Sequence, residues 1–278
     1  MLNKKNALIT GGAGLLGPQH AKALNEIGFN IILLDIDSKN LSMNFKKLKK
    51  QLKKKTRIYK FNCDITSESQ VKKVSSELLE KKIYIDVLVN NADINPKRET
   101  AFYKKVNKNR DARTGTIENY SIKELSRELS VGIIGTFICS KVFGEHMKLR
   151  KKGSIINISS DLGITAPDQR VYDKDEKIQK VKNFKPIGYS ISKHGVIGIT
   201  KYISTYWAHK NIRCNTLVPG AVLNNQPKFL KRNIMKRIPL NRLAKVDEYK
   251  KAIQFLATDD SSYMTGQSLI MDGGRTIW

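Results

Sequence analysis

The sequence predicts an α/β protein with a Rossmann-type fold, a doubly wound parallel sheet of about seven strands with helices on both faces. Short β-rich runs alternate with longer amphipathic runs along the chain. Several short runs, such as 31–34 and 87–89, are apolar without interruption, which is typical of parallel strands covered by helices on both faces. A glycine-rich turn follows the first short run, where this fold binds phosphate.

Seven short runs are expected to be strands, and five amphipathic runs are expected to be helices. The strands are 7–10, 30–35, 57–62, 85–90, 154–159, 213–218 and 268–271. The helices are 19–27, 69–81, 122–149, 190–210 and 246–257. Two polar stretches that contain proline, 94–119 and 161–188, fit neither pattern and are expected to be long loops. Because we see no repeat and no linker, we expect residues 1–278 to form one domain with insertions at these two places.

The chain is strongly basic, with a formal net charge of +26 at pH 7. Such a charge suits nucleic acid, an anionic membrane surface or an acidic small molecule. In the lysine-rich run 46–55, however, apolar residues recur at helical spacing from Leu41 to Leu52, so these lysines are expected to form the solvated face of a helix. No nucleic-acid-binding motif accompanies the charge, and we expect no nucleic-acid partner.

Other features of the composition indicate a soluble protein of the cytoplasm. No apolar run approaches the roughly 20 residues that cross a bilayer, so we expect no membrane partner. Residues 1–10 lack the long hydrophobic region and cleavage site of a signal peptide. Cys63, Cys139 and Cys214 each lie in an apolar segment without metal-like spacing, so we expect buried thiols and neither a disulfide nor a metal.

Residues 10–17 form the turn Thr-Gly-Gly-Ala-Gly-Leu-Leu-Gly between the first strand and the first helix. Gly11, Gly14 and Gly17 let the backbone turn tightly and approach a pyrophosphate, whose charge the free N–H groups of the helix N-terminus stabilise. A glycine-rich turn alone is also compatible with a simple tight connection. The order of strand, glycine turn and helix favours dinucleotide binding.

The end of the second strand supports a dinucleotide and favours NAD over NADP. Asp35 lies where a carboxylate accepts hydrogen bonds from the adenosine ribose and repels a 2′-phosphate. Asp37 adds to this repulsion, whereas Lys39 weakens it. We therefore expect NAD as the preferred cofactor and NADP as the alternative.

Tyr189 and Lys193 lie four residues apart, which puts a phenol and an ammonium on one face of a helix. A second pair with this spacing, Tyr206 and Lys210, lies in an aromatic stretch that indicates packing. Tyr189 instead opens the helix after the fifth strand, and Ser160 lies at the end of that strand. This position makes Ser160, Tyr189 and Lys193 the candidate catalytic residues.

These three side chains suit hydride transfer between a nicotinamide and a carbinol or carbonyl carbon. A tyrosine with a pKa near 10 is a poor base, and a cation about 4 Å away supplies the roughly 4 kcal/mol that lowers this pKa to about 7. Lys193 is expected to be that cation. Ser160 would hold the substrate oxygen while Tyr189 moves the proton.

The chain resembles the short-chain dehydrogenase/reductase family over nearly its whole length. Further matching segments are Cys63-Asp64-Ile65-Thr66, Asn90-Asn91-Ala92, Asn215 to Gly220 and Met271-Asp272-Gly273-Gly274. The resemblance implies that Asp64 and Ile65 border the adenine and that Asn91 and Val222 lie along the cofactor. It also makes Leu16, Tyr189 and Lys193 cofactor contacts, with Lys193 at the nicotinamide ribose, and it implies a homodimer or homotetramer.

Three features depart from the family pattern. Asp93 replaces the glycine that usually follows Asn-Asn-Ala. Gly132 stands where an asparagine of a water-mediated proton relay is often found, so proton delivery is expected to take another route. The glycine loop has the spacing of longer relatives that modify sugar nucleotides.

A narrower resemblance links the chain to oxidoreductases of bacterial flagellin-glycan and nonulosonic-acid pathways. It rests on segments 10–17, 91–97, 166–169 and 185–186, and it implies a sugar or sugar-phosphate substrate in surface-glycan biosynthesis. Arg170 in the loop 161–188 is the candidate for gripping such a substrate, since a guanidinium binds phosphate or carboxylate with two hydrogen bonds. Ordinary solvated charge is the alternative for Arg170.

Two other functions stay open at this point. One is a sugar epimerase or dehydratase that keeps NAD tightly bound. The other is a catalytically inactive Rossmann protein that binds or senses NAD. The intact Ser160, Tyr189 and Lys193 argue against the inactive protein, whereas Gly132 argues weakly for it.

Overall fold

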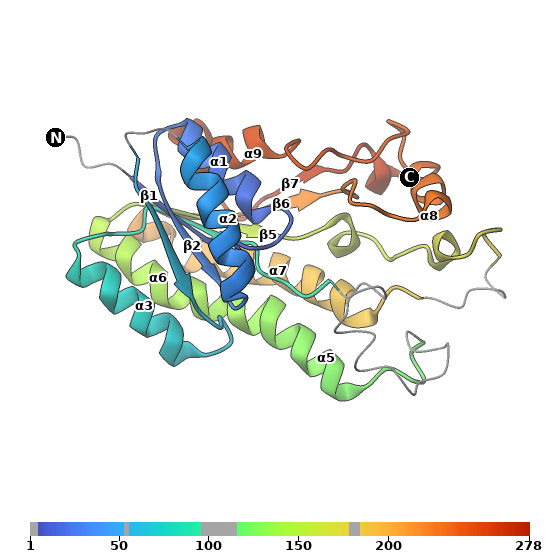
Figure 1. Ribbon diagram of the computed structural model, residues 1–278, viewed down its shortest axis with the longest axis horizontal. Helices are drawn as coiled ribbons and strands as arrows, with labels where there is room; N and C mark the ends of the chain where they lie inside the picture. The colour runs from blue at the N-terminus through green and yellow to red at the C-terminus, as the bar shows by residue number, and fades with distance from the viewer. Residues whose placement is uncertain (1–4, 53–55, 96–115, 178–183) are drawn as a thin grey trace.

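The computed structural model describes residues 5–52, 56–95, 116–177 and 184–278. Its centre is a seven-stranded parallel sheet with the strand order β3-β2-β1-β4-β5-β6-β7 (Figure 1). The strands are β1 (Asn6–Thr10), β2 (Asn30–Asp35), β3 (Ile58–Asn62), β4 (Val87–Asn90), β5 (Gly153–Ile158), β6 (Ile212–Pro219) and β7 (Ser268–Met271). The predicted Rossmann-type sheet is therefore confirmed, and each predicted strand overlaps one of these seven.

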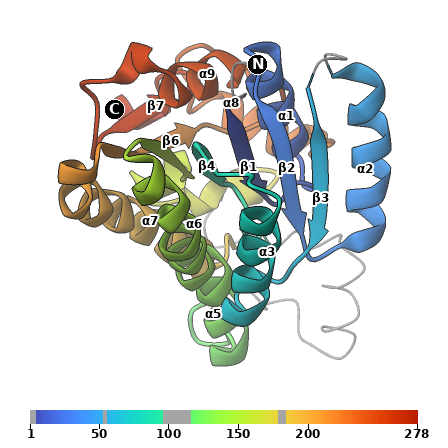
Figure 2. The same cartoon turned by 90° about the vertical axis from the view of Figure 1, so that its left-hand side faces the viewer.

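The helices of the described residues lie on both faces of this sheet (Figure 2). They are α1 (Gly17–Glu26), α2 (Ser38–Gln51), α3 (Glu68–Glu80), α5 (Ile122–Leu129), α6 (Thr136–Arg150), α7 (Ile187–Tyr206), α8 (Lys228–Met235) and α9 (Lys250–Ala257). The predicted helix 122–149 is interrupted, because a π-helical turn at Ser130–Gly135 separates α5 from α6. The sequence pattern did not predict the short helix α8.

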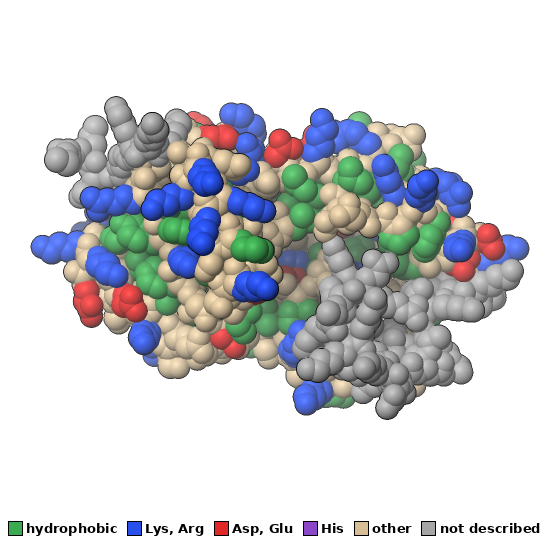
Figure 3. All heavy atoms as spheres, viewed as in Figure 1, with side chains coloured by type: hydrophobic (Ala, Val, Ile, Leu, Met, Phe, Trp, Pro, Cys, Tyr) green, Lys and Arg blue, Asp and Glu red, His purple; other side chains and the backbone are tan. Residues whose placement is uncertain are grey.

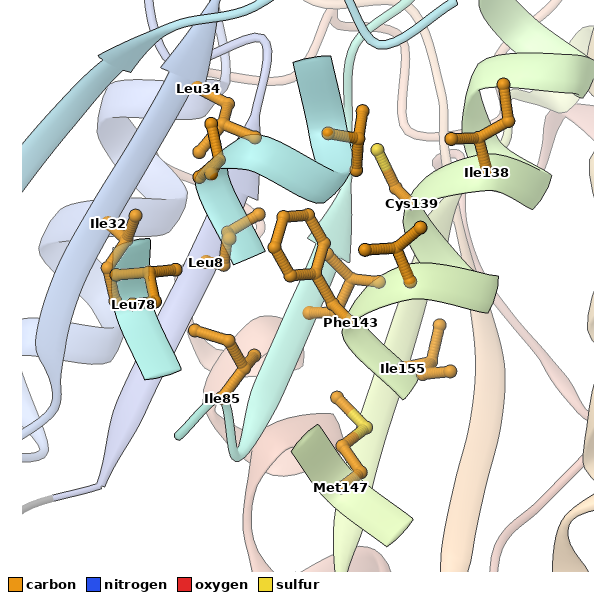
Figure 4. Packing of buried hydrophobic residues seen from close by; sticks show 14 of the residues in the cluster. Leu8, Ile32, Leu34, Leu78, Ile85, Ile138, Cys139, Phe143, Met147 and Ile155 are labelled. Atoms are coloured by element: carbon orange, nitrogen blue, oxygen red, sulfur yellow. The ribbon is translucent and has the colours of Figure 1, made fainter. Parts of the chain in front are cut away.

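Alternate residues of the central strands supply two separate hydrophobic cores. Leu8 of β1 faces α3 and α6, where it packs in one cluster with Leu78 and Phe143 (Figure 4). Its neighbours Ala7 and Ile9 face the other way, in a cluster with residues of α1, α2 and α9. Successive strand residues point to opposite faces, so a strand buried on both faces must be apolar throughout. This explains the uninterrupted apolar runs.

The three cysteines are free and buried within the strand and helix framework, as expected of small apolar side chains. The lysines of α2 lie on its exposed face, opposite the buried Leu41 and Leu48. Figure 3 shows Lys and Arg spread over the visible face rather than gathered in one patch. None of the helices in the described ranges has the length and apolar character needed to span a membrane.

The two predicted loops are described in part. Most of 94–119 lies outside the described residues. The described part of 161–188 contains two short 3-10 turns, Asp161–Gly163 and Gln169–Tyr172, and its last residues belong to α7. These turns carry chain from the end of β5 across the carboxyl edge of the sheet. Ligands of open α/β sheets bind at this edge, beside the point where the strand order reverses between β1 and β4.

Candidate active site

One cavity of about 1540 Å³ opens at the carboxyl edge of the sheet. It brings together most of the residues that the sequence predicts for the site. The predicted residues that line it are Gly11, Gly14, Leu16, Asp35, Asp64, Ile65, Asn91, Ser160, Tyr189, Lys193 and Val222. Gly17 and Arg170 do not line it. A single space therefore connects the glycine turn with the Ser160 and Tyr189 hydroxyls.

The glycine turn after β1 forms a tight cradle in which side chains have no room. Gly11 has a φ of +67°, and a Cβ there would lie 2.8 Å from Asn91 Nδ2 and 2.9 Å from Ala92 Cα. A Cβ on Gly17 would lie 2.3 Å from the Gly11 carbonyl oxygen. Asn91 braces the turn, because its Nδ2 donates to the carbonyl oxygens of Thr10 at 3.0 Å and Gly11 at 3.2 Å.

The N-terminus of α1 faces this cradle without a side-chain cap at Leu16. The first N–H groups of a helix have no partner within the helix, and they favour a negatively charged ligand. A glycine-rich turn beside such a helix end fits the pyrophosphate of a dinucleotide. Gly17 lies beneath the cradle, which explains why it shapes the turn without lining the cavity.

Two carboxylates lie at the adenosine end expected for such a ligand. Asp35 accepts hydrogen bonds from the backbone N–H of Ala13 at 2.8 Å and of Asp37 at 2.9 Å. Asp37 caps α2 by accepting from the backbone N–H of Asn40 at 2.9 Å, and this hydrogen bond lowers the Asp37 pKa. Each carboxylate oxygen has a further lone pair for a ribose hydroxyl.

At the other end of the cavity, Ser160 follows β5 and is buried. Its hydroxyl donates to Asp161 Oδ1 at 2.7 Å and accepts from the Leu162 N–H at 3.2 Å. Asp161 forms a buried ion pair with Arg275, which comes from the C-terminal segment after β7. The Ser160 hydroxyl is thus fixed by its own turn, which the Arg275–Asp161 ion pair ties to the C-terminal segment.

Tyr189 and Lys193 lie one turn apart in α7, with the Lys193 ammonium 5.6 Å from the centre of the Tyr189 ring. Lys193 donates to the Ile158 carbonyl oxygen at 2.8 Å and forms an ion pair with Asp93 Oδ2 at 2.9 Å. These contacts fix the ammonium between α7 and the ends of β4 and β5.

The expected lowering of the Tyr189 pKa by Lys193 is wrong for the protein alone. Burial raises this pKa most, and the Asp93 carboxylate raises it further, while a hydrogen bond with the Ser160 hydroxyl lowers it. The Lys193 charge is balanced by Asp93 at 2.9 Å, so its effect on the phenol is largely cancelled.

A family model described as Enoyl-(Acyl carrier protein) reductase matches residues 13–276. The chain is 31% identical over 280 residues to a 3-oxoacyl-[acyl-carrier-protein] reductase of Thermotoga maritima, covering 99% of both chains. The chain belongs to the short-chain dehydrogenase/reductase family. As a member of this family it is an oxidoreductase with a nicotinamide cofactor.

This short-chain dehydrogenase/reductase also has similar proteins whose names refer to sugar acids. A 2-dehydro-3-deoxy-D-gluconate 5-dehydrogenase of Bacillus subtilis is 31% identical over 284 residues, with 98% of this chain and 95% of the relative covered. A gluconate 5-dehydrogenase of Burkholderia cenocepacia, solved in complex with NADP and tartrate, superposes with a TM-score of 0.81 at 25% identity. That match covers 100% of this chain and 97% of the solved one.

Sequence reasoning missed several charged residues of this short-chain dehydrogenase/reductase site. Lys185, four residues before Tyr189, places its ammonium 3.8 Å from the centre of the Tyr189 ring and donates to Asn95 Oδ1 at 2.5 Å. Burial lowers the Lys185 pKa to about 8. Lys185 lies four residues before Tyr189, just as Lys193 lies four residues after it. This spacing could have predicted that both lysines lie near Tyr189. The role of Arg275 had no local signal, since its partner Asp161 lies 114 residues earlier.

Arg170 binds an acidic neighbour rather than the cavity. Its guanidinium donates to both carboxylate oxygens of Asp168, at 2.9 and 3.0 Å, and its side chain is 58% exposed. Arg237 binds the same carboxylate. Asp168 does line the cavity, so Arg170 lies just behind its wall.

Proposed function

We propose that this oxidoreductase transfers a hydride between NAD and a secondary alcohol, or the corresponding carbonyl, of a sugar-like molecule. One observation carries the proposal. A single cavity joins a glycine-rich cradle at a helix N-terminus to the side chains of Ser160, Tyr189 and Lys193. The cradle suits a dinucleotide. The three side chains suit proton transfer at an oxygen whose carbon gains or loses hydride.

The proposed step assigns a role to each side chain. Ser160 holds the substrate oxygen by a hydrogen bond, and the ionised Tyr189 oxygen takes the proton of the alcohol. The C–O bond becomes C=O as the carbon loses its hydride. When bound, the nicotinamide ring accepts that hydride. Lys193 would contact the cofactor ribose.

The remaining predicted contacts hold the cofactor. The turn with Gly11, Gly14, Leu16 and Gly17 would bind the pyrophosphate. Asp64 and Ile65 would border the adenine, and Asn91 and Val222 would lie along the cofactor; all four line the cavity. Asp35 and Asp37 place two negative charges where a 2′-phosphate of NADP would lie, which supports NAD as the preferred cofactor.

The proposed substrate is a sugar acid or sugar phosphate. Asn224, Gln226 and Lys185 line the cavity and offer hydrogen-bond donors and one cation. A hydroxyl-rich molecule with an anionic group matches these side chains. A place in flagellin-glycan or other surface-glycan biosynthesis, and a contact from Arg170, extend this proposal. We further propose that the chain acts in the cytoplasm as one domain.

Apolar side chains on the outer faces of α6 and α7 support a homodimer or homotetramer. Phe137, Tyr202 and Tyr206 are 48%, 67% and 60% exposed. Large exposed apolar side chains on neighbouring helices are typical of subunit contacts. Light scattering of the purified protein tests this assembly.

A panel of alcohols tests the proposed reaction. The purified protein is incubated with xylitol, D-gluconate, D-threitol, sugar phosphates or nucleotide sugars, each with NAD⁺ and with NADP⁺, and NADH or NADPH absorbance is followed. Net NADH formation with a sugar-like alcohol supports the proposal. Copurifying NAD without net NADH release favours the epimerase or dehydratase, because such enzymes return the hydride to the substrate. Cofactor binding with no conversion of any compound favours the inactive protein.

A further inference from the structure

Asp93 and Lys193 form a buried ion pair beside the candidate proton-transfer group. Asp93 Oδ2 lies 2.9 Å from Lys193 Nζ, and the two side chains are 8% and 6% exposed. Asp93 follows β4, whereas Lys193 lies in α7, so the pair joins a strand end to a helix. The Lys193 ammonium also donates a hydrogen bond to the Ile158 carbonyl oxygen, at the end of β5. Its position therefore depends on groups outside its own helix.

The Ser192 hydroxyl and the Asp93 carboxylate together occupy the space where a side chain of residue 132 would lie. A Cβ on Gly132 would lie 2.7 Å from Asp93 Oδ1 and 1.8 Å from Ser192 Oγ. Gly132 is buried in the π-helical turn between α5 and α6, a kind of turn that is frequent at functional sites. A side chain at position 132 would thus overlap with Ser192 and Asp93, whose side chains fill this volume.

We propose that Asp93 is a positioning residue of the hydride-transfer site, whose carboxylate lies with the Ser192 hydroxyl in the space over Gly132 and holds the Lys193 ammonium in place beside Tyr189. The proposal rests on the proposed function for the roles of Tyr189 and Lys193. In this proposal Asp93 holds the Lys193 ammonium, because a side chain at position 132 has no room to do so.

Stability alone is a poor explanation of this pair. A buried ion pair repays the loss of hydration only when its other polar atoms are also hydrogen-bonded. Among the described residues, both carboxylate oxygens of Asp93 and the Ser192 Oγ are buried and have no hydrogen-bond partner. Keeping a charge in such a place costs free energy, so the charge itself must have a use.

The Asp93 charge acts on the pKa of Tyr189. Asp93 is the charged group that raises the Tyr189 pKa most after burial. Negative charge from Asp93 and Asp161 opposes ionisation of the phenol, and the Ser160 hydrogen bond favours it. The charged and titratable groups around Tyr189 are Asp93, Glu128, Asp161 with its partner Arg275, Tyr172, Lys185 and Lys193. Removing the charge of Asp93 alone should make Tyr189 easier to ionise.

The Asp93→Asn variant tests this without changing side-chain size. Alcohol oxidation needs the ionised Tyr189, so its rate rises with pH through the Tyr189 pKa. We expect the midpoint of this rise to move down by about 1 pH unit in Asp93→Asn, as one nearby charge does at a partly buried site. Asp260→Asn, which removes an exposed carboxylate at the opposite edge of the sheet, is the matched control and should not move the midpoint.

A second readout needs no substrate. Ultraviolet difference absorbance of tyrosinate, taken as the protein minus its Tyr189→Phe version, follows Tyr189 ionisation directly in both the Asp93 and the Asp93→Asn backgrounds. The same downward shift is expected. If no alcohol in the panel is oxidised, the proposed function fails, yet this titration still decides the role of Asp93. A midpoint that changes by less than about 0.2 pH units overturns the inference.

A carboxylate supplied from position 132 in place of position 93 keeps the test valid even if Asp93→Asn does not fold. The background Asp93→Gly/Ser192→Ala removes the carboxylate and the hydroxyl that blocks residue 132. Adding Gly132→Asp returns a carboxylate to the position of Asp93 Oδ1 from the other side. We expect the background to lose about tenfold or more in kcat, and the added carboxylate to recover most of it and to restore the original pH midpoint. No recovery with intact NADH binding contradicts the proposed positioning role.

Discussion

The Lys185 ammonium lies 3.8 Å from the centre of the Tyr189 ring, on the cavity side of the residue that the proposed reaction uses for proton transfer. Lys185 precedes α7 and is held by a hydrogen bond to Asn95. Burial lowers its pKa to about 8, although Asp93, Asp161 and Glu128 raise it. The Lys185 ammonium beside Tyr189 therefore loses its charge as the pH rises through about 8.

This relationship predicts a pH-dependent preference for anionic substrates. The folded-state pKa of Lys185 is lowered from 10.5, so its ammonium is present below about pH 8 and is lost as the pH rises through that value. We expect the ratio of kcat/KM for D-gluconate to that for xylitol to fall about tenfold between pH 7 and pH 9. In Lys185→Met the ratio should be low at both pH values. A ratio that stays constant with pH in the unmodified protein contradicts this role.

Arg170→Ala tests, in the same assay, whether Arg170 rather than Lys185 binds the anionic group of the substrate. Its guanidinium binds Asp168 and is 58% exposed, so the structure favours a smaller rise in KM for D-gluconate than Lys185→Met gives. A larger rise in KM for Arg170→Ala would instead make Arg170 the main anion contact, as the sequence interpretation has it.

Gly11→Ala should abolish cofactor binding. A Cβ at this position meets Asn91 and Ala92 at less than 3 Å, in a backbone with a φ of +67°. Gly28→Ala is a matched control, because Gly28 also has a positive φ, of +96°, but has nothing within 4 Å of the added Cβ. Gly28→Ala should lose about 1 kcal/mol of folding free energy from backbone strain, and Gly11→Ala should lose more because its Cβ also meets backbone atoms. Only Gly11→Ala should lose NADH fluorescence enhancement, and equal NADH affinity in the two variants would separate this turn from the cofactor.

Asp35→Ala should weaken the preference for NAD over NADP. The Asp35 carboxylate is held by the Ala13 and Asp37 N–H groups at the expected ribose position. Its removal takes away both a ribose acceptor and a charge that repels a 2′-phosphate. Calorimetric titration with both cofactors should show the NAD⁺/NADP⁺ affinity ratio falling about tenfold, or about 1.4 kcal/mol. Tighter binding of NADP⁺ than of NAD⁺ by the unmodified protein contradicts the predicted preference.

The sheet was predictable because its strands are buried on both faces. Continuous apolar runs such as 31–34 leave no other place for those residues than the centre of a layered fold. The cavity-lining positions of Asp35, Ser160 and Tyr189 follow from the same pattern, since each lies at the end of a predicted strand or at the start of a helix. Helix α8 was missed because eight residues, four of them polar and four apolar, are too few for a clear helical period.

The electrostatics of the site were not predictable from local sequence. The Asp93–Lys193 pair joins positions 100 residues apart, and the effect of Asp93 on Tyr189 depends on burial that only the fold creates. The four-residue spacing predicted that Lys193 lies beside Tyr189. It did not predict that the Asp93 carboxylate balances the charge of Lys193. The absence of a side chain at Gly132, which leaves room for Asp93 and Ser192, likewise matters only because the fold packs the π-helical turn against the end of β4 and against α7.

Single-turnover oxidation of a substrate from the alcohol panel by Tyr189→Phe, with bound NAD⁺, tests proton transfer at this site most directly. The substitution removes only the hydroxyl, so NAD⁺ affinity should change little while the rate of NADH formation falls 10²- to 10⁴-fold or more. Tyr206→Phe is the matched control, because Tyr206 also precedes a lysine by four residues but is 60% exposed and stacks on Tyr202. It should keep the full rate. If Tyr189→Phe keeps more than about one per cent of the rate, Tyr189 is not the proton-transfer residue.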